Sequence, residues 1–86
     1  SRGLGDVYKR QEYHTSRGRI DLVLQTDRYI YIMEFKLNGT AEEALQQIED
    51  KQYALPFTSD TRTLFRIGVN FSNETRNIDT WKIQTT

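Results

Sequence analysis

Residues 19–37, RIDLVLQTDRYIYIMEFKL, decide the fold that we expect for this chain. In both halves of this stretch apolar residues alternate with other residues, with the period of two that is typical of half-buried β-strands. In the first half, Ile20, Leu22 and Leu24 should share one face of the strand, and Asp21 should lie on the other face. The stretch is therefore expected to form a β-hairpin.

A polar break at residues 27–28 fits a two-residue turn between the two strands. Counting outward from that turn places Asp21 directly opposite Glu34 on one face of the sheet. Lys36 should share that face and lie opposite Arg19. Two carboxylates and an ammonium group should therefore converge at one end of the hairpin. A shift of the register by one residue would separate Asp21 from Glu34.

A helix is expected directly after the hairpin. Thr40 and Glu43 have the spacing of a capping box, which predicts a helix start at Thr40. Pro56 should end this helix at about Leu55. An apolar stripe follows at helical spacing, formed by Ala41, Ala44, Leu45, Ile48 and Leu55.

Further strands are expected at residues 12–15, 63–71 and 78–84, the last as an edge strand. The order β-β-β-α-β-β predicts an α/β fold with a mixed α+β sheet. Residues 1–11 are interpreted as a poorly ordered lead-in, foreign to the natural protein, and residues 12–86 as one domain.

The composition excludes several kinds of chemistry. The chain has 86 residues, a formal net charge of zero, no Cys and one His, His14. These counts argue against a strongly basic nucleic-acid coat, a disulfide framework, a thiolate zinc site and a cysteine nucleophile. No apolar run is long enough to span a membrane and no signal peptide opens the chain, so we expect a cytoplasmic protein.

The expected cluster suits metal-assisted hydrolysis of a phosphodiester. Mg²⁺ favours one or two carboxylates together with water and phosphate oxygens, which Asp21 and Glu34 could provide. Lys36 could hold or deprotonate an attacking water, and Arg19 offers a fork for phosphate. The alternative is an ordinary solvated strand face with ion pairs, which the spacing alone leaves open.

Three stretches together resemble the PD-(D/E)XK nuclease superfamily. They are GRIDLVL at residues 18–24, MEFKLNGTAEEALQQIEDKQYALPF at residues 33–57, and RIGVNFSNETRNIDTWKI at residues 66–83. The resemblance is nearest to the domain at the C-terminus of bacterial AAA-ATPase-like proteins, and it implies a truncated restriction-endonuclease-like core. The helix that usually opens this core is not seen in the sequence.

The resemblance also implies roles for individual residues. Asp21 and Glu34 would bind Mg²⁺ or Mn²⁺, helped by the backbone carbonyl of Phe35, and Lys36 would position or activate the hydrolytic water. Gln47, on the following helix, matches a glutamine that many members use, although it could equally be an ordinary polar helix residue.

Lys51 stands one turn after Gln47, where related nucleases often carry Tyr, and with Arg19 it would contact substrate phosphate. Glu12 could add an acidic group from the first strand. The function implied is a metal-dependent nuclease acting on nucleic acid, DNA in the first instance, beside an AAA-ATPase-like domain. No G-x-x-x-x-G-K-[ST] motif occurs, so these residues are not expected to bind ATP. The alternative is a non-catalytic module that binds nucleic acid or regulates an attached ATPase.

Overall fold

A computed structural model of the chain describes residues 9–15 and 18–85, with only the backbone for residues 9–15 and 19. The elements in order are β1 (Lys9–Thr15), β2 (Gly18–Gln25), β3 (Tyr29–Leu37), α1 (Ala41–Asp50), the 3₁₀ turn η1 (Leu55–Phe57), β4 (Thr63–Ser72) and β5 (Asn77–Thr85). The predicted order of strands and helix is confirmed. β1 begins at Lys9, three residues before the predicted domain boundary at Glu12, so Lys9–Gln11 belong to the sheet.

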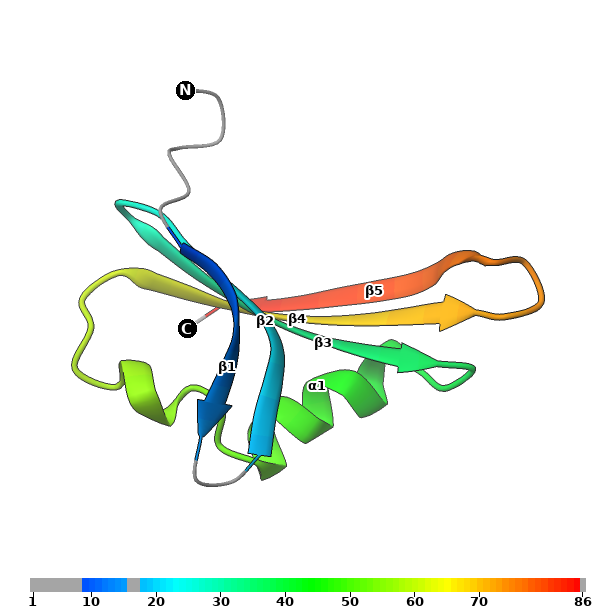
Figure 1. Ribbon diagram of the computed structural model, residues 1–86, viewed down its shortest axis with the longest axis horizontal. Coiled ribbons are helices and arrows are strands. Elements are labelled where there is room, and N and C mark those ends of the chain that lie inside the picture. The colour runs from blue at the N-terminus through cyan, green and yellow to red at the C-terminus, as the bar shows by residue number, and fades with distance from the viewer. Residues whose placement is uncertain (1–8, 16–17, 86) are drawn as a thin grey trace.

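The strands form one five-stranded sheet in the order β1-β2-β3-β4-β5. Neighbouring strands are antiparallel except β3 and β4, which run parallel. A parallel pair needs a crossover, and α1 provides it by passing across one face of the sheet (Figure 1). We call this the covered face and the opposite one the open face. Within residues 9–15 and 18–85, no helix packs on the open face.

The β2–β3 hairpin has the predicted two-residue turn and register. The ladder runs from the Gln25–Ile30 pair to the Leu22–Met33 pair. At the turn, the N–H of Thr26 donates to the carbonyl of Tyr29 over 2.9 Å. The ladder ends at Leu22–Met33, so the next predicted pair, Asp21 opposite Glu34, is not formed as a ladder pair.

A β-bulge interrupts β2 where the ladder ends. The β1–β2 register shifts between Gln11 and Tyr13, so Asp21 and Leu22 together face one residue of β1. Because a bulge adds one residue to one strand, it also shifts the alternation of side chains. Ile20 is fully buried in the core beneath α1. The prediction that Ile20 shares a face with Leu22 is therefore wrong.

The predicted start of α1 is confirmed in detail. The hydroxyl of Thr40 accepts from the N–H of Glu43, and the Glu43 carboxylate accepts from the N–H of Thr40, each over 2.9 Å. This capping box fixes the first turn of the helix immediately after β3. Ala41 and Ala44 then face the sheet with no exposed surface.

α1 ends in a Schellman motif built on a residue other than glycine. Gln52 has a left-handed φ of 53°, its N–H donates to the carbonyl of Glu49, and the N–H of Tyr53 donates to the carbonyl of Ile48, each over 3.0 Å. The motif returns Tyr53 to the core, where its exposed fraction is 2%. The predicted helix end at Leu55 is therefore wrong, since Leu55 lies in η1 and is 58% exposed.

The core lies between α1 and the covered face. Its largest cluster consists of Ile20, Val23, Ile30, Ile32, Leu45, Ile48, Tyr53 and Leu64. α1 approaches β4 so closely that a Cβ at Gly68 would collide with the carbonyl oxygen of Ala41. The helix is thus seated directly on β3 and β4, and this position determines which side chains of β3 it can reach.

Candidate functional site

The bulge in β2 directs Asp21 toward β3. Its Oδ2 accepts a hydrogen bond from the backbone N–H of Phe35 over 3.0 Å. The carboxylate thereby takes the place of the missing ladder partner, because the β2–β3 ladder has ended two residues before Phe35. Bulges are common beside active sites, where they redirect a side chain in this way. Asp21 is half-buried and is held against the peptide that links Glu34 to Phe35.

The backbone of Phe35 faces Asp21 with its carbonyl as well. In an antiparallel ladder, the N–H and C=O of one residue both point to the same neighbouring strand. Since the N–H of Phe35 reaches Asp21, its carbonyl oxygen is directed to the same side of β3. A carboxylate and a backbone carbonyl are thus brought to one edge of β3.

Glu34, Gln47 and Lys36 form a continuous hydrogen-bonded chain. The Gln47 Nε2 group donates to Oε2 of Glu34 over 2.5 Å, and Gln47 Oε1 accepts from Lys36 Nζ over 2.7 Å. The orientation of the amide follows from its partners, because an ammonium group only donates and a carboxylate only accepts. Gln47 therefore links the two charged side chains of β3 from the helix above them.

Local structure explains why these three residues meet. Glu34 and Lys36 follow Ile30 and Ile32 on the covered face of β3, where alternate residues point toward α1. Glu34 is 4% exposed, so its side chain is buried next to the apolar core. Gln47 lies on one side of α1. Because the helix packs closely on the sheet, the Gln47 amide reaches both Glu34 and Lys36.

The oxygen donors of Asp21, Glu34 and Phe35 are of the chemical kind that a hard divalent cation takes. Within the described residues no group of three or more His, Cys, Asp or Glu side chains could hold a metal. The oxygen donors at the site are the carboxylates of Asp21 and Glu34 and the carbonyl of Phe35. Mg²⁺ is typically bound through one or two carboxylates while it keeps several waters, so two carboxylates and a carbonyl suit it.

The other predicted site residues lie at different distances from this cluster. The backbone of Arg19 pairs with His14 on β1, and the β2–β3 ladder contains no Arg19–Lys36 pair, so that prediction is wrong. The side chains of Arg19 and Glu12 lie outside the described part of the structure. Lys51 caps α1, is exposed, and stands four residues after Gln47 on the same flank of the helix.

One buried polar residue beside the cluster was not predicted from the sequence. Asn70, on β4, pairs in register with Lys36 and is 3% exposed. The alternating apolar residues of β4 indicated a strand, but they lie on its open face. Asn70 belongs to the alternate set of residues, which faces α1. The signal that could have identified Asn70 is its polar side chain on the covered face, in register with Lys36.

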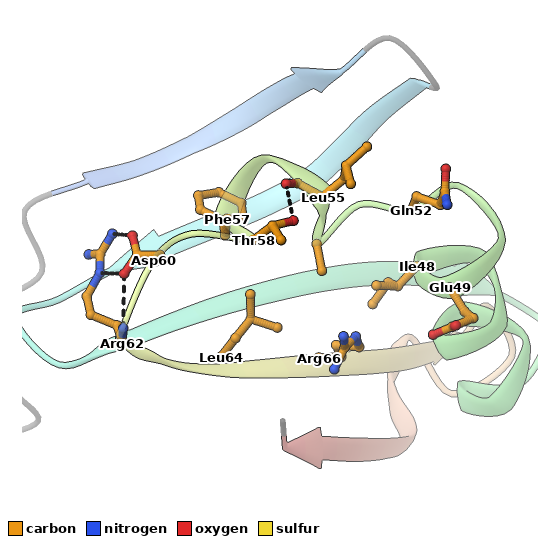
Figure 2. Close-up of a pocket in the computed structure, with 11 residues that line it drawn as sticks. Ile48, Glu49, Gln52, Leu55, Phe57, Thr58, Asp60, Arg62, Leu64 and Arg66 are labelled. Carbon is orange, nitrogen blue, oxygen red and sulfur yellow. Dashed lines mark hydrogen bonds and ion pairs between the residues drawn. The ribbon is translucent and has the colours of Figure 1, made fainter.

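A cavity of about 420 Å³ lies at the C-terminal end of α1 (Figure 2), and its lining includes none of Asp21, Glu34, Lys36 and Gln47. Asp60 and Arg62 line it and form an ion pair of 2.7 Å. The hydrogen bond from Arg62 lowers the pKa of the Asp60 carboxyl to about 2. Arg62 also donates to the carbonyl of Thr26 and the side chain of Gln25, each over 2.9 Å. These contacts tie the loop before β4 to the β2–β3 turn.

Comparisons with known proteins identify a family and a relative of this chain. The family model of the PD-(D/E)XK nuclease superfamily matches residues 4–81, starting within the predicted lead-in. An uncharacterised protein in the vnfD 5′ region of Azotobacter chroococcum mcd 1 is 37% identical over 71 residues, which cover 80% of this chain and 14% of that protein. The chain thus spans about a seventh of this relative. No solved structure matches.

No helix among the described residues has the length and apolar character needed to cross a membrane. The family match covers nearly all of the chain, and it includes the strand that carries Glu34 and Lys36, the bulge that carries Asp21 and the helix that carries Gln47. The superfamily is one of nucleases. This chain belongs to the PD-(D/E)XK nuclease superfamily.

Proposed function

We propose that this domain hydrolyses phosphodiester bonds of nucleic acid, DNA in the first instance, in the presence of Mg²⁺ or Mn²⁺. The observation that carries the proposal is the hydrogen-bonded chain from Glu34 through Gln47 to Lys36, with the Asp21 carboxylate held at the adjacent peptide. An ordinary solvated strand face does not require a buried carboxylate joined to an ammonium group through a helix amide.

Asp21, Glu34 and the carbonyl of Phe35 would hold the cation. Bound there, Mg²⁺ would supply Lewis-acid chemistry to the phosphodiester group. The N–H of Phe35 keeps Asp21 oriented, and the Gln47 amide keeps Glu34 oriented, so neither carboxylate must reorganise during the reaction. Supporting hydrogen bonds of this kind hold the ligands of a functional site in the productive geometry.

Lys36 would act directly on the reacting atoms. One of the three N–H groups of its ammonium is used by Gln47, and the other two can donate to the attacking water or to a phosphoryl oxygen. Donation to the phosphoryl group stabilises the negative charge that develops as the bond to the leaving oxygen breaks. Arg19 and the exposed Lys51 are proposed to contact flanking phosphates of the substrate.

The test is cleavage of single- and double-stranded DNA and RNA with Mg²⁺ or Mn²⁺. We expect cleavage by the wild-type chain, and loss of it in Asp21→Asn and Lys36→Met. Asp50→Asn is the matched control, because Asp50 is exposed on α1 and bonds only to Gln46 among the contacts described. Cleavage that is equal in Asp21→Asn, Lys36→Met and wild type would contradict the proposal.

Calorimetric titration with Mn²⁺ separates this function from its alternative, a module that only binds nucleic acid or regulates an ATPase. A catalytic centre predicts specific uptake of Mn²⁺ that Glu34→Gln abolishes. Binding without a centre predicts nucleic-acid affinity that depends on salt and is unchanged by Glu34→Gln. The proposed context in the whole protein is an adjacent AAA-ATPase-like domain, as the sequence resemblance implies, and the coding sequence of the whole protein tests it.

A further inference from the structure

We propose that Asn70 is a positioning residue of the site and that Asp79 fixes the orientation of its carboxamide. The proposal rests on the proposed function, since it concerns the geometry of Gln47 relative to Glu34 and Lys36. Neither Asn70 nor Asp79 belongs to the cluster that was predicted from the sequence.

Asn70 connects β4 to the segment between β3 and α1. Its Oδ1 accepts the backbone N–H of Gly39 over 2.8 Å, and its Nδ2 donates to Oδ2 of Asp79 over 3.3 Å. With an exposed fraction of 3%, the side chain is almost excluded from water, so leaving its polar atoms without partners would carry a full desolvation penalty. Asn70 also pairs in register with Lys36 on the neighbouring strand.

The space around Gly39 is too small for a larger residue. A Cβ placed on it would lie 2.6 Å from Oε1 of Glu43, 3.4 Å from Cβ of Lys36 and 3.7 Å from Oδ1 of Asn70. The peptide of Gly39 therefore sits against the stem of Lys36, the capping carboxylate of the helix and the carboxamide of Asn70. Three parts of the molecule meet at this point.

Gly39 immediately precedes Thr40, the N-cap of α1. The hydrogen bond from Gly39 to Asn70 thus ties the first turn of the helix to β4. Gln47 lies on that helix, and its two hydrogen bonds to β3 depend on where the helix begins and how it is rotated. A displacement of about 1 Å in a reacting site can cost roughly 100-fold in rate, so this tie bears on turnover.

Asp79 and the N–H of Gly39 favour the same orientation of the Asn70 amide. The β4–β5 register passes from Asn70–Thr80 to Phe71–Ile78, which makes Asp79 the additional residue of a bulge in β5. A carboxylate accepts hydrogen bonds, so it draws the NH₂ group of Asn70 toward β5 and leaves the oxygen facing Gly39.

The decisive experiment exchanges the two side chains. Asn70→Asp alone sets two carboxylates against each other, and we expect kcat to fall by about 10- to 100-fold with KM within about threefold of wild type. Asn70→Asp combined with Asp79→Asn restores a donor opposite an acceptor, and kcat should return to within about threefold of wild type. Asn77→Asp, on the same hairpin, is the matched control and should leave kcat unchanged.

A second measurement on the same variants does not depend on activity. In the wild-type chain the amide hydrogen of Gly39 should exchange slowly, and the Gln47 side-chain NH₂ resonances should be shifted by the Glu34 carboxylate. Asn70→Asp should accelerate Gly39 exchange by at least tenfold and move the Gln47 resonances, while the exchanged pair restores both.

The possible failures can be told apart. Absence of cleavage by the wild-type chain, with the Gly39 and Gln47 signals responding as expected, contradicts the proposed function and leaves the structural tie in place. If Asn70→Asp leaves kcat, Gly39 exchange and the Gln47 resonances unchanged, or if the exchanged pair is no better than Asn70→Asp, the positioning role is wrong.

Discussion

The two faces of β3 differ although they belong to the same nine residues. On the covered face, Ile30 and Ile32 have no exposed surface and Glu34 is 4% exposed. On the open face, Tyr29 and Tyr31 are only half-buried, and their rings pack against each other and against Phe65 of β4. Helix α1 accounts for the difference, because it buries one face and leaves the other to pack on itself.

Stability and the proposed function depend on the same face of the sheet. The aliphatic core and the polar chain of Glu34, Gln47 and Lys36 lie on the same face under the same helix. Packing that fixes α1 on the sheet therefore also fixes the amide that orients both charged groups. The open face stabilises the sheet without contacting these groups, so substitutions on the two faces should have separable effects.

Lys36→Met should give the largest effect, on the covered face. We expect kcat to fall by about 1,000-fold, within the range of roughly 100- to 10,000-fold that is typical of a directly acting group. The free energy of unfolding should change by no more than about 1 kcal/mol, because the methionine keeps most of the stem. Single-turnover cleavage and urea denaturation measure the two quantities. Met33→Leu, on the open face, is the control, and an equal loss of turnover there would refute the separation of the faces.

Ile32→Ala should give the largest loss of stability. Ile32 is fully buried, so truncation leaves a cavity, and we expect a loss of about 2–5 kcal/mol in the free energy of unfolding. Met33→Ala, one residue along on the open face, should cost about 1 kcal/mol, since Met33 is only half-buried. Urea denaturation followed by circular dichroism compares them, and similar losses at both positions would mean that α1 does not define the core.

Tyr31→Leu tests the packing of the open face. The rings of Tyr31 and Phe65 are stacked, with centroids 5.1 Å apart and an interplanar angle of 11°. Removing this contact should cost about 0.5–1.5 kcal/mol in the free energy of unfolding and leave kcat unchanged. An unchanged free energy of unfolding would show that the stacking of Tyr31 on Phe65 does not stabilise the sheet.

Asp60→Asn should give the smallest effect, and one that depends on pH. Arg62 lowers the pKa of the Asp60 carboxyl from 3.8 to about 2. Because the folded pKa is depressed, the resulting stabilisation is complete above pH 3.8 and is lost as the pH falls through about 2. Urea midpoints should therefore favour wild type over Asp60→Asn at pH 5 and converge as the pH approaches 2. A constant difference at both pH values would rule out this linkage.

The sequence predicted the centre of the fold well because strong local signals coincide there. The bounds of β3 and the register of the β2–β3 hairpin follow from alternation together with a polar turn. The start of α1 follows from the capping box of Thr40 and Glu43. These features depend on neighbouring residues alone, so they can be read from a short stretch of sequence.

The differences arise where tertiary structure overrides a local pattern. The regular apolar residues Ile20, Leu22 and Leu24 conceal the bulge, because alternation alone does not reveal an extra residue in a ladder. The end of α1 was missed because Gln52, rather than glycine, adopts the left-handed conformation. The link from Gln47 to both Glu34 and Lys36 requires the helix to be placed on the sheet, which spacing does not provide.

Paramagnetic broadening by Mn²⁺ tests most directly whether these side chains form one centre. Substoichiometric Mn²⁺ is added to the ¹⁵N-labelled chain, and the resonances that broaden first identify the bound position. A single centre predicts early loss of the backbone amide signals of Asp21 and Phe35 and of the Gln47 side-chain NH₂ signals, with each effect abolished by Glu34→Gln. Broadening that begins at exposed acidic residues such as Glu42 or Glu74, and persists in Glu34→Gln, would contradict it.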